Sequence, residues 1–477
     1  MAAIPAAASV GGKADSRGMS SWILDIPLGR FFLDFALLSL LLIVATWLRS
    51  RVQLIQKFLI PNNLIAGFLG LMIGMNGLGW IDLTTERLGG YIYHLLALLF
   101  IAVGLRAPKQ QVGLSSVKFG LIFISVYLVQ ALIGLSIAFL LIWAFMPELF
   151  AGIGLLAPLA FGMNPGIAYT IGQNWELHGF ESGAVVGLTF AAIGFLVAYT
   201  VGLWLLHRGV RAGKAAYLSK AEQLPEEVRT GLFPSDKKPK GGHLTTSGEA
   251  IESLTFHLSL IGLAYLVTWL SLSGIEKVLV LNGAEQEVNT LWSFHFIAAA
   301  VVALFIRMVI DKLKLGYLVD DTTMTRSANL FMDFMIVASV AAISWGVVRE
   351  YLVPLVLISI FVAAATWLLI HRMTRETFRE FQLERFIAIF GNLTGTIQSA
   401  LVLLRVLDSR LKSPVSYNLV YGSGLALLFG FPLLLLINAP VHYFEDVTLG
   451  FAYVGVALFG YLLLILGAWH FLSNRNK

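Results

Sequence analysis

Two short stretches decide the fold, FGMNPG at residues 161–166 and FGNLTG at residues 390–395. Both follow the pattern Phe-Gly-x-x-x-Gly, and both interrupt a segment that is otherwise apolar. Glycine permits close backbone approach and proline removes a backbone donor, so each stretch predicts a break in a helix. Inside a membrane such backbone must be covered by protein or by a watery cavity. The same residues could also kink two ordinary helices or let them pack closely.

The composition around these stretches is that of a membrane protein. The chain has 477 residues, of which 58% are hydrophobic and 13% are charged. An ordinary soluble domain has roughly 25% charged residues. A soluble enzyme, a nucleic-acid binder and a disordered chain are therefore excluded. The absence of cysteine excludes disulfides, thiolate metal ligands and a cysteine nucleophile.

Apolar runs of roughly 20 residues, enough to cross about 30 Å of hydrocarbon, recur along the chain. They predict spans at 31–48, 62–79, 90–105, 119–145, 180–207, 254–275, 291–310, 328–347, 351–371, 415–437 and 447–472. Two further apolar stretches, 151–176 and 386–408, contain the breaks. Residues 1–30 are expected to form a mobile tail, and the polar stretch 208–250 is expected to be a linker.

The placement of basic residues tests whether 151–176 and 386–408 cross the membrane. If both are re-entrant hairpins and the N-terminus is outside, most of the 33 Lys and Arg residues lie in the cytoplasm, together with the 208–250 linker. If both cross fully, the basic linker and most basic residues lie outside. Cytoplasmic segments are normally enriched in Lys and Arg, which is known as the positive-inside rule. This rule favours two re-entrant hairpins.

This topology predicts an all-α membrane protein with two inverted five-span repeats. The first repeat is 31–207 with hairpin 151–176, and the second is 251–437 with hairpin 386–408. Each hairpin precedes the fifth span of its repeat, and 447–472 forms one extra C-terminal span. Inverted repeats with broken elements are typical of secondary transporters.

The two hairpins and the polar residues near them suggest a site for a small polar solute and Na⁺. Half-helix N-termini attract anions, and free carbonyl groups bind cations. The candidate substrate-binding residues are Gly162, Asn164, Gly166, Gly391, Asn392, Thr394, Gly395, Thr396 and Arg405. The candidate ion-binding residues are Asn63, Asp333, Gln398 and Ser399. No transition-metal site and no nucleophile–base pair are expected.

Three of these residues keep a second interpretation. Asp333, placed within a span, either couples an ion or forms a buried pair. Arg405 either binds a substrate carboxylate through its two guanidinium donors, reaches to the cytoplasmic surface, or pairs with Asp408. Asn63 follows Pro61 and could cap a helix start.

Beside these arguments, the chain resembles the sodium/glutamate symporter family over roughly residues 31–437. FLIPNNLIAG at 58–67 looks like the segment that opens the family's second span, and FIAVGL at 100–105 resembles the end of its third span. Residues 155–166 and 391–396 lie where the family has two glycine-rich re-entrant loops. Because Asn164 and Pro165 replace a family histidine, the chain is identified as a divergent member.

The resemblance implies a homodimer with a scaffold domain and a transport domain in each protomer. It implies Na⁺-coupled symport of glutamate or a related small carboxylate anion by alternating access. The alternatives are a sodium/citrate-like carrier, an H⁺-coupled carrier of another small polar solute, and a channel. We expect no enzyme activity, no cofactor and no nucleic-acid partner, with Na⁺ as the coupling ion. The expected location is the bacterial inner membrane.

Overall fold

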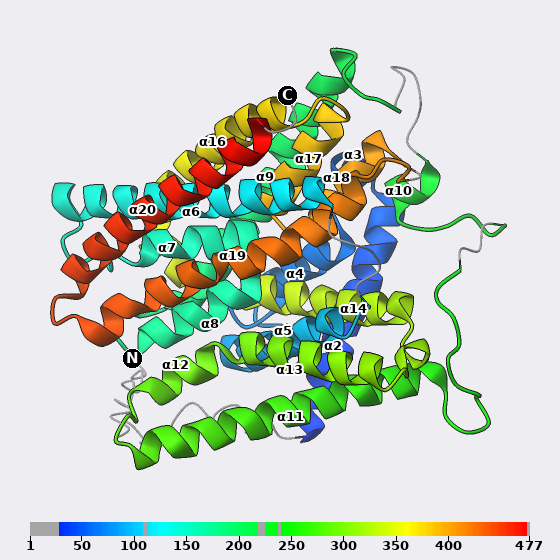
Figure 1. Ribbon diagram of the computed structural model, residues 1–477, viewed down its shortest axis with the longest axis horizontal. Coiled ribbons are helices and arrows are strands. Elements are labelled where there is room, and N and C mark those ends of the chain that lie inside the picture. Colours follow the sequence, from blue (N-terminus) through cyan, green and yellow to red (C-terminus); the bar gives the residue numbers. More distant parts are fainter. Residues whose placement is uncertain (1–27, 108–112, 218–224, 237–239, 410, 475–477) are drawn as a thin grey trace, which may run out of the picture.

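The computed structural model describes residues 28–107, 113–217, 225–236, 240–409 and 411–474 (Figure 1). Within these ranges the regular structure is entirely helical. Residues 1–27 of the predicted tail lie outside the described residues, as do 218–224 and 237–239 of the linker.

The helices are, in chain order, α2 Leu28–Arg51, α3 Gln53–Phe58, α4 Asn62–Ile73, α5 Thr85–Gly104, α6 Leu114–Ala144, α7 Ile153–Pro158, the π-helical turn η1 Leu159–Met163, α8 Pro165–Glu176, α9 Gly183–Arg211, α10 Glu226–Thr230, α11 Ser253–Leu281, α12 Glu287–Ser293, α13 His295–Lys312, the 3₁₀ turn η2 Gly316–Leu318, α14 Asp321–Ala341, α15 Trp345–Glu350, α16 Leu352–Thr377, α17 Gln382–Leu393, α18 Ile397–Leu407, α19 Val415–Tyr443 and α20 Val447–Asn474.

Long apolar helices make this an integral membrane protein. Within the described residues, eight helices are long and apolar enough to cross a membrane, namely α2, α5, α6, α9, α11, α16, α19 and α20. Helices α12 and α13 together would make a ninth span, bent by 58° at their junction. The prediction of an all-α membrane protein is confirmed.

The second expected span of each half differs from the prediction. Helix α4 stops at Ile73, so its 12 residues cover only about 18 Å at 1.5 Å per residue. A glycine-rich turn follows, in which a Cβ on Gly77 would collide with the carbonyl oxygens of Leu71 and Met72. The expected span 291–310 is divided at Phe294 into α12 and α13. Both segments are therefore interrupted where a continuous span was predicted.

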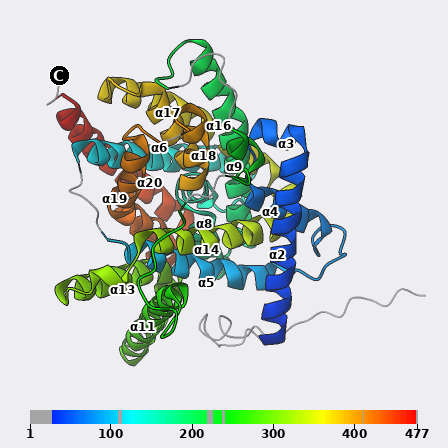
Figure 2. The same cartoon turned by 90° about the vertical axis from the view of Figure 1, so that its right-hand side faces the viewer.

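The helices pack in two groups. The first group contains α2, α4, α5, α11, α13 and α14, and the second contains α6 to α9 and α16 to α20. Helices α11 to α13 lie along the lower edge of Figure 1, and Figure 2 shows α2 standing at the opposite side of the same group. Between the groups, α14 packs against α8 and α9, and α5 packs against α8. These contacts bring the polar residues of α14 to the breaks.

Candidate functional site

The first break lies between η1 and α8, where the helical hydrogen bonds stop at Asn164. Asn164 has extended backbone angles, φ −169° and ψ 139°. Its side-chain Oδ1 accepts a hydrogen bond from the Gly166 N–H at 2.7 Å, and Pro165 occupies the first helical position. Asparagine at a helix N-cap followed by proline satisfies and removes backbone donors that would otherwise be unpaired. The first break therefore satisfies its backbone N–H groups with its own residues.

The second break connects α17 to α18 through Thr394, Gly395 and Thr396. The Thr394 N–H and its hydroxyl both donate to the Phe390 carbonyl, at 3.0 and 2.8 Å. The chain reverses at this point, and as a result Gly391 of α17 faces Ala400 of α18. A Cβ on Gly391 would lie 3.0 Å from the Ala400 Cα, so only glycine allows the two backbones to approach this closely.

Two residues of neighbouring long helices touch both breaks. The Gln130 side chain of α6 donates to the Leu393 carbonyl at 3.0 Å, and its Oε1 would lie 3.2 Å from a Cβ on Gly162. On α9, a Cβ on Gly194 would lie 2.7 Å from the Thr394 carbonyl oxygen and 3.3 Å from the Phe161 ring. Segments more than 200 positions apart in the sequence therefore meet between α6 and α9.

A polar cluster joins α4, α14 and α18 beside the second break. Asn63 donates from Nδ2 to the Asp333 carboxylate at 2.8 Å and to Gln398 Oε1 at 3.3 Å. Gln398 donates in turn to Asn329 at 3.5 Å. Three of the four residues predicted to bind an ion are thus in contact. The fourth, Ser399, is buried next to Gln398 and faces Tyr199 of α9.

The other side of α14 contacts the first break. Asn164 Nδ2 lies 3.7 Å from the Met332 sulfur, and a Cβ on Gly166 would lie 3.0 Å from the Met335 sulfur. Asp333 follows Met332 directly. Helix α14 therefore contacts the first break through Met332 and Met335 and the start of α18 through Asn329, at the boundary of the two helix groups.

Three buried oxygen atoms around this region have no hydrogen-bond partner within the described residues. They are Asn63 Oδ1, Gln130 Oε1 and Thr396 Oγ1. A buried polar atom without a partner costs about 1–3 kcal/mol, so such atoms need an explanation. Carboxylate and neutral oxygen atoms are the ligands that hard cations take. Of the three, Asn63 Oδ1 is on a side chain that contacts a carboxylate, Asp333, so this pair suits a small cation bound as cargo.

The structure brings most predicted substrate-binding residues together and leaves one apart. Those near the breaks are all buried, namely Gly162, Asn164, Gly166, Gly391, Asn392, Thr394, Gly395 and Thr396. Arg405 is exposed instead. It lies nine residues beyond Thr396 along α18, or about 13 Å at 1.5 Å per residue. The buried cluster does not include its guanidinium group.

Sequence reasoning missed Gln130 and Gly194. Gln130 left a signal, since it is the one amide side chain among the 31 mostly apolar residues of α6, and polar residues inside a span usually face a partner or cavity. Gly194 left no such signal among 45 glycines, because its role depends on contacts with distant segments.

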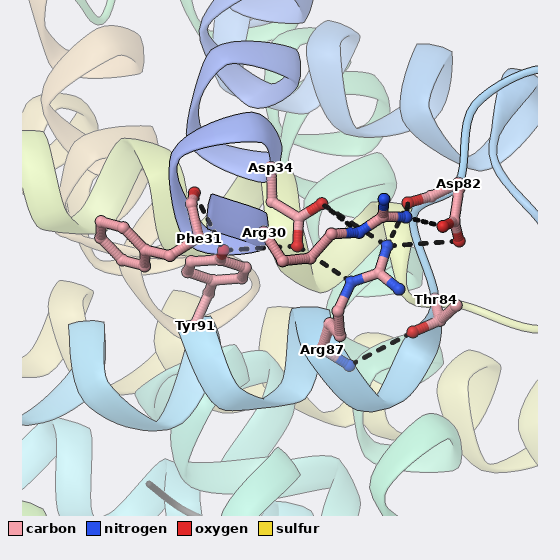
Figure 3. Close-up of polar contacts among 7 residues, drawn as sticks. All are labelled: Arg30, Phe31, Asp34, Asp82, Thr84, Arg87 and Tyr91. Atoms are coloured by element: carbon pink, nitrogen blue, oxygen red, sulfur yellow. Dashed lines mark hydrogen bonds and ion pairs between the residues drawn. The ribbon is translucent and has the colours of Figure 1, made fainter. Parts of the chain in front are cut away.

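A second buried charge cluster fixes the start of α2 (Figure 3). The Asp34 carboxylate is fully buried and accepts from Arg87 Nε at 3.0 Å and from Tyr91 at 3.3 Å. Arg30 lies 4.0 Å from Asp34, four residues further along α2, and also pairs with Asp82. Every charge here has a partner of opposite sign, so this cluster ties α2 to α5 and offers no group to a ligand.

Two surface cavities lie away from the breaks. One is lined by Leu42, Ile43, Thr46, Trp47, Ser50 and Leu232 on the outer face of α2, and another lies at the C-terminal ends of α16 and α20. The chemistry places the site at the breaks, where the polar residues converge and are closed off from the surface. Comparisons with protein-family models, curated proteins and solved structures find no match to this chain.

Proposed function

We propose that this protein is a secondary active transporter that couples Na⁺ entry to the uptake of glutamate or a related small carboxylate anion. One observation carries the proposal. A helix break from each half of the chain lies against α14, the helix that carries the Asp333 carboxylate, at the boundary between two helix groups. Broken helices that expose backbone groups at mid-depth are the usual binding elements of such carriers.

Packing between the halves supports an inverted repeat. Helix α5, third in the first half, packs against α13 and α14 of the second half. Helix α14, third in the second half, packs against α4 and α5 of the first half. If the two halves are exchanged about a two-fold axis, the contacts of α5 correspond to the contacts of α14. The interrupted second segments and the breaks also fall at matching places, which supports two re-entrant hairpins, 151–176 and 386–408, in the repeats 31–207 and 251–437.

The chemistry of the site assigns complementary roles to its groups. Na⁺ would bind Asp333 and the neutral oxygens of Asn63, Gln130 or Thr396. The substrate carboxylate would lie at the N-terminus of α18, where Thr396 makes no side-chain cap and the first N–H groups point toward the break. Binding of the cation first would reduce repulsion between Asp333 and the anion. Movement of one helix group against the other would then expose the site to the opposite side.

The same proposal includes orientation and assembly. The positive-inside rule places the 208–250 linker in the cytoplasm and the N-terminus outside, in the bacterial inner membrane. A homodimer is proposed on the family resemblance. The exposed apolar faces of α2 and α11 then contact either lipid or the second protomer.

The test is transport by the full-length protein in sealed liposomes. Uptake of labelled glutamate and citrate is measured with an inward Na⁺ gradient, with choline replacing Na⁺, and with an inward H⁺ gradient. Saturable uptake of one solute that requires Na⁺ is expected. Since one charge crossing 100 mV is worth about 2.3 kcal/mol, a Na⁺ excess over substrate charge also predicts stimulation by an inside-negative potential.

Other outcomes distinguish the alternatives. Uptake that is unchanged in choline contradicts Na⁺ coupling, and uptake driven by H⁺ alone identifies a proton-coupled carrier. Flux that does not saturate with solute concentration identifies a channel. Liposomes containing the Gly391→Leu protein serve as the matched control for leakage.

A further inference from the structure

A basic cavity of about 530 Å³ lies where the C-terminal ends of α16 and α20 meet. Three arginines line it, Arg372, Arg375 and Arg379, together with Glu376. Ser473 of α20 forms part of the opposite wall. The cavity is separate from the helix breaks, and the proposed transport reaction uses none of these residues.

The three arginines are close together in the sequence. Arg372 and Arg375 are three residues apart near the end of α16, which puts them on the same face of that helix, and Arg379 follows two residues after its end at Thr377. Glu376 pairs with Arg372 at 3.0 Å. Within the described residues, neither Arg375 nor Arg379 has a carboxylate partner, so the cavity has an excess of positive charge.

The cavity lies at the edge of the membrane. Both α16 and α20 are candidate spans, and their ends are joined by a hydrogen bond of 2.9 Å from Trp469 Nε1 to the Thr377 hydroxyl. A second bond of 3.3 Å runs from the Ser473 hydroxyl to the Glu376 carbonyl. Tryptophan near the end of a span is typical of the interface between hydrocarbon and water.

Apolar side chains are also exposed on the two spans. Leu368 of α16 and Leu464 of α20 are 59% and 71% exposed, and Phe471, two residues before Ser473, is 66% exposed. A ligand that fills the cavity and also covers apolar surface of this kind needs an anionic head and a hydrocarbon tail. A free anion would use only the arginines.

We propose that this cavity binds the phosphate headgroup of an anionic phospholipid, with its acyl chains along α16 and α20. The guanidinium groups of Arg375 and Arg379 would donate to the phosphate oxygens, a geometry that arginine matches with two parallel hydrogen bonds. Basic pockets between membrane helices on the cytoplasmic side are suited to such headgroups. The extra C-terminal helix α20 then has a role, since it supplies one wall of the lipid site.

The test uses the full-length protein in detergent, with binding measured by native mass spectrometry and by thermal unfolding. Phosphatidylglycerol, phosphatidylcholine and inorganic phosphate are added separately. The test variant is Arg375→Gln/Arg379→Gln. The control is Arg208→Gln/Arg211→Gln, which removes the same charge from exposed positions at the end of α9. That end lies near the start of α17, since the Ala216 N–H bonds Glu384 at 2.7 Å.

We expect phosphatidylglycerol to bind the natural protein at least 10-fold more tightly than phosphatidylcholine and to raise its melting temperature. The test variant should lose this preference, and the control should keep it. Equal binding of both lipids by the natural protein overturns the proposal without any variant. Stabilisation by inorganic phosphate equal to that by phosphatidylglycerol identifies a phosphate site instead. Equal loss in both variants shows a diffuse charge effect and also overturns it.

Discussion

The two helix breaks differ in how their polar groups are paired where the helical hydrogen bonds stop. In the first, Asn164 caps the Gly166 N–H, Pro165 removes a donor, and Tyr127 donates to the Gly162 carbonyl at 2.9 Å. In the second, Thr396 begins α18 without a side-chain cap, and its hydroxyl has no partner within the described residues. The first break is satisfied by protein groups, whereas the second leaves groups unpaired.

This difference assigns different roles to the breaks. A buried polar group that lacks a partner costs free energy, so it persists where a ligand can supply the partner. We therefore infer that the second break carries most of the recognition of solute and ion. The first break supports α14 through its contacts with Met332 and Met335.

The largest effect is expected for Gly391→Leu. The added side chain would collide with the Ala400 backbone, which cannot move without separating α17 from α18. Uptake should fall to background while the protein remains in the membrane. The control is Gly424→Leu on α19, where a Cβ meets no atom within 4 Å. Gly395→Ala should be milder, because its nearest neighbour is the rotatable Ser399 hydroxyl. Normal uptake by Gly391→Leu would remove the second break from the site.

The next largest effect is expected for Asp333→Asn. The substitution keeps the shape of the side chain but removes the negative charge beside Asn63 and Gln398. The concentration of Na⁺ that gives half-maximal uptake should rise at least 10-fold, and Na⁺ should no longer raise the melting temperature. The control is Asp311→Asn, an exposed carboxylate that pairs with Arg307. An unchanged Na⁺ dependence would show that Asp333 forms only a structural pair.

The sequence predicts the helical membrane class and the two breaks because both depend on local composition. Apolar runs set the helices, and Asn164 and Pro165 stop one of them wherever they occur in such a run. The cluster of Asn63, Asp333 and Gln398 was predicted only as three separate candidates. Their contacts join segments up to 335 positions apart, and this depends on packing. The exposed position of Arg405 depends on the same long-range packing.

The contrast between the breaks is tested most directly by Asn164→Ala and Thr396→Ala. Loss of the N-cap at Asn164 should lower the free energy of unfolding by about 1 kcal/mol. Removing the unpartnered Thr396 hydroxyl should leave the free energy of unfolding unchanged or slightly higher, and should weaken solute or ion binding roughly 2- to 13-fold, the equivalent of about 0.5–1.5 kcal/mol. Melting temperature and uptake are measured on both proteins. The opposite pattern would reverse the roles assigned to the two breaks.

The smallest effect is expected at Asp320, which begins the helix that touches both breaks. Burial alone raises the pKa of Asp320. Hydrogen bonds from the Thr323 N–H and hydroxyl, at 2.7 and 2.9 Å, together with those from His243, outweigh it and lower the pKa overall. A lowered folded-state pKa stabilises the protein above the unfolded pKa, and this stabilisation is lost as pH falls through the folded pKa. Asp320→Asn should therefore melt slightly below the natural protein at pH 7, and the difference should shrink toward pH 3. A difference that is constant with pH would show that the carboxylate charge does not stabilise the start of α14.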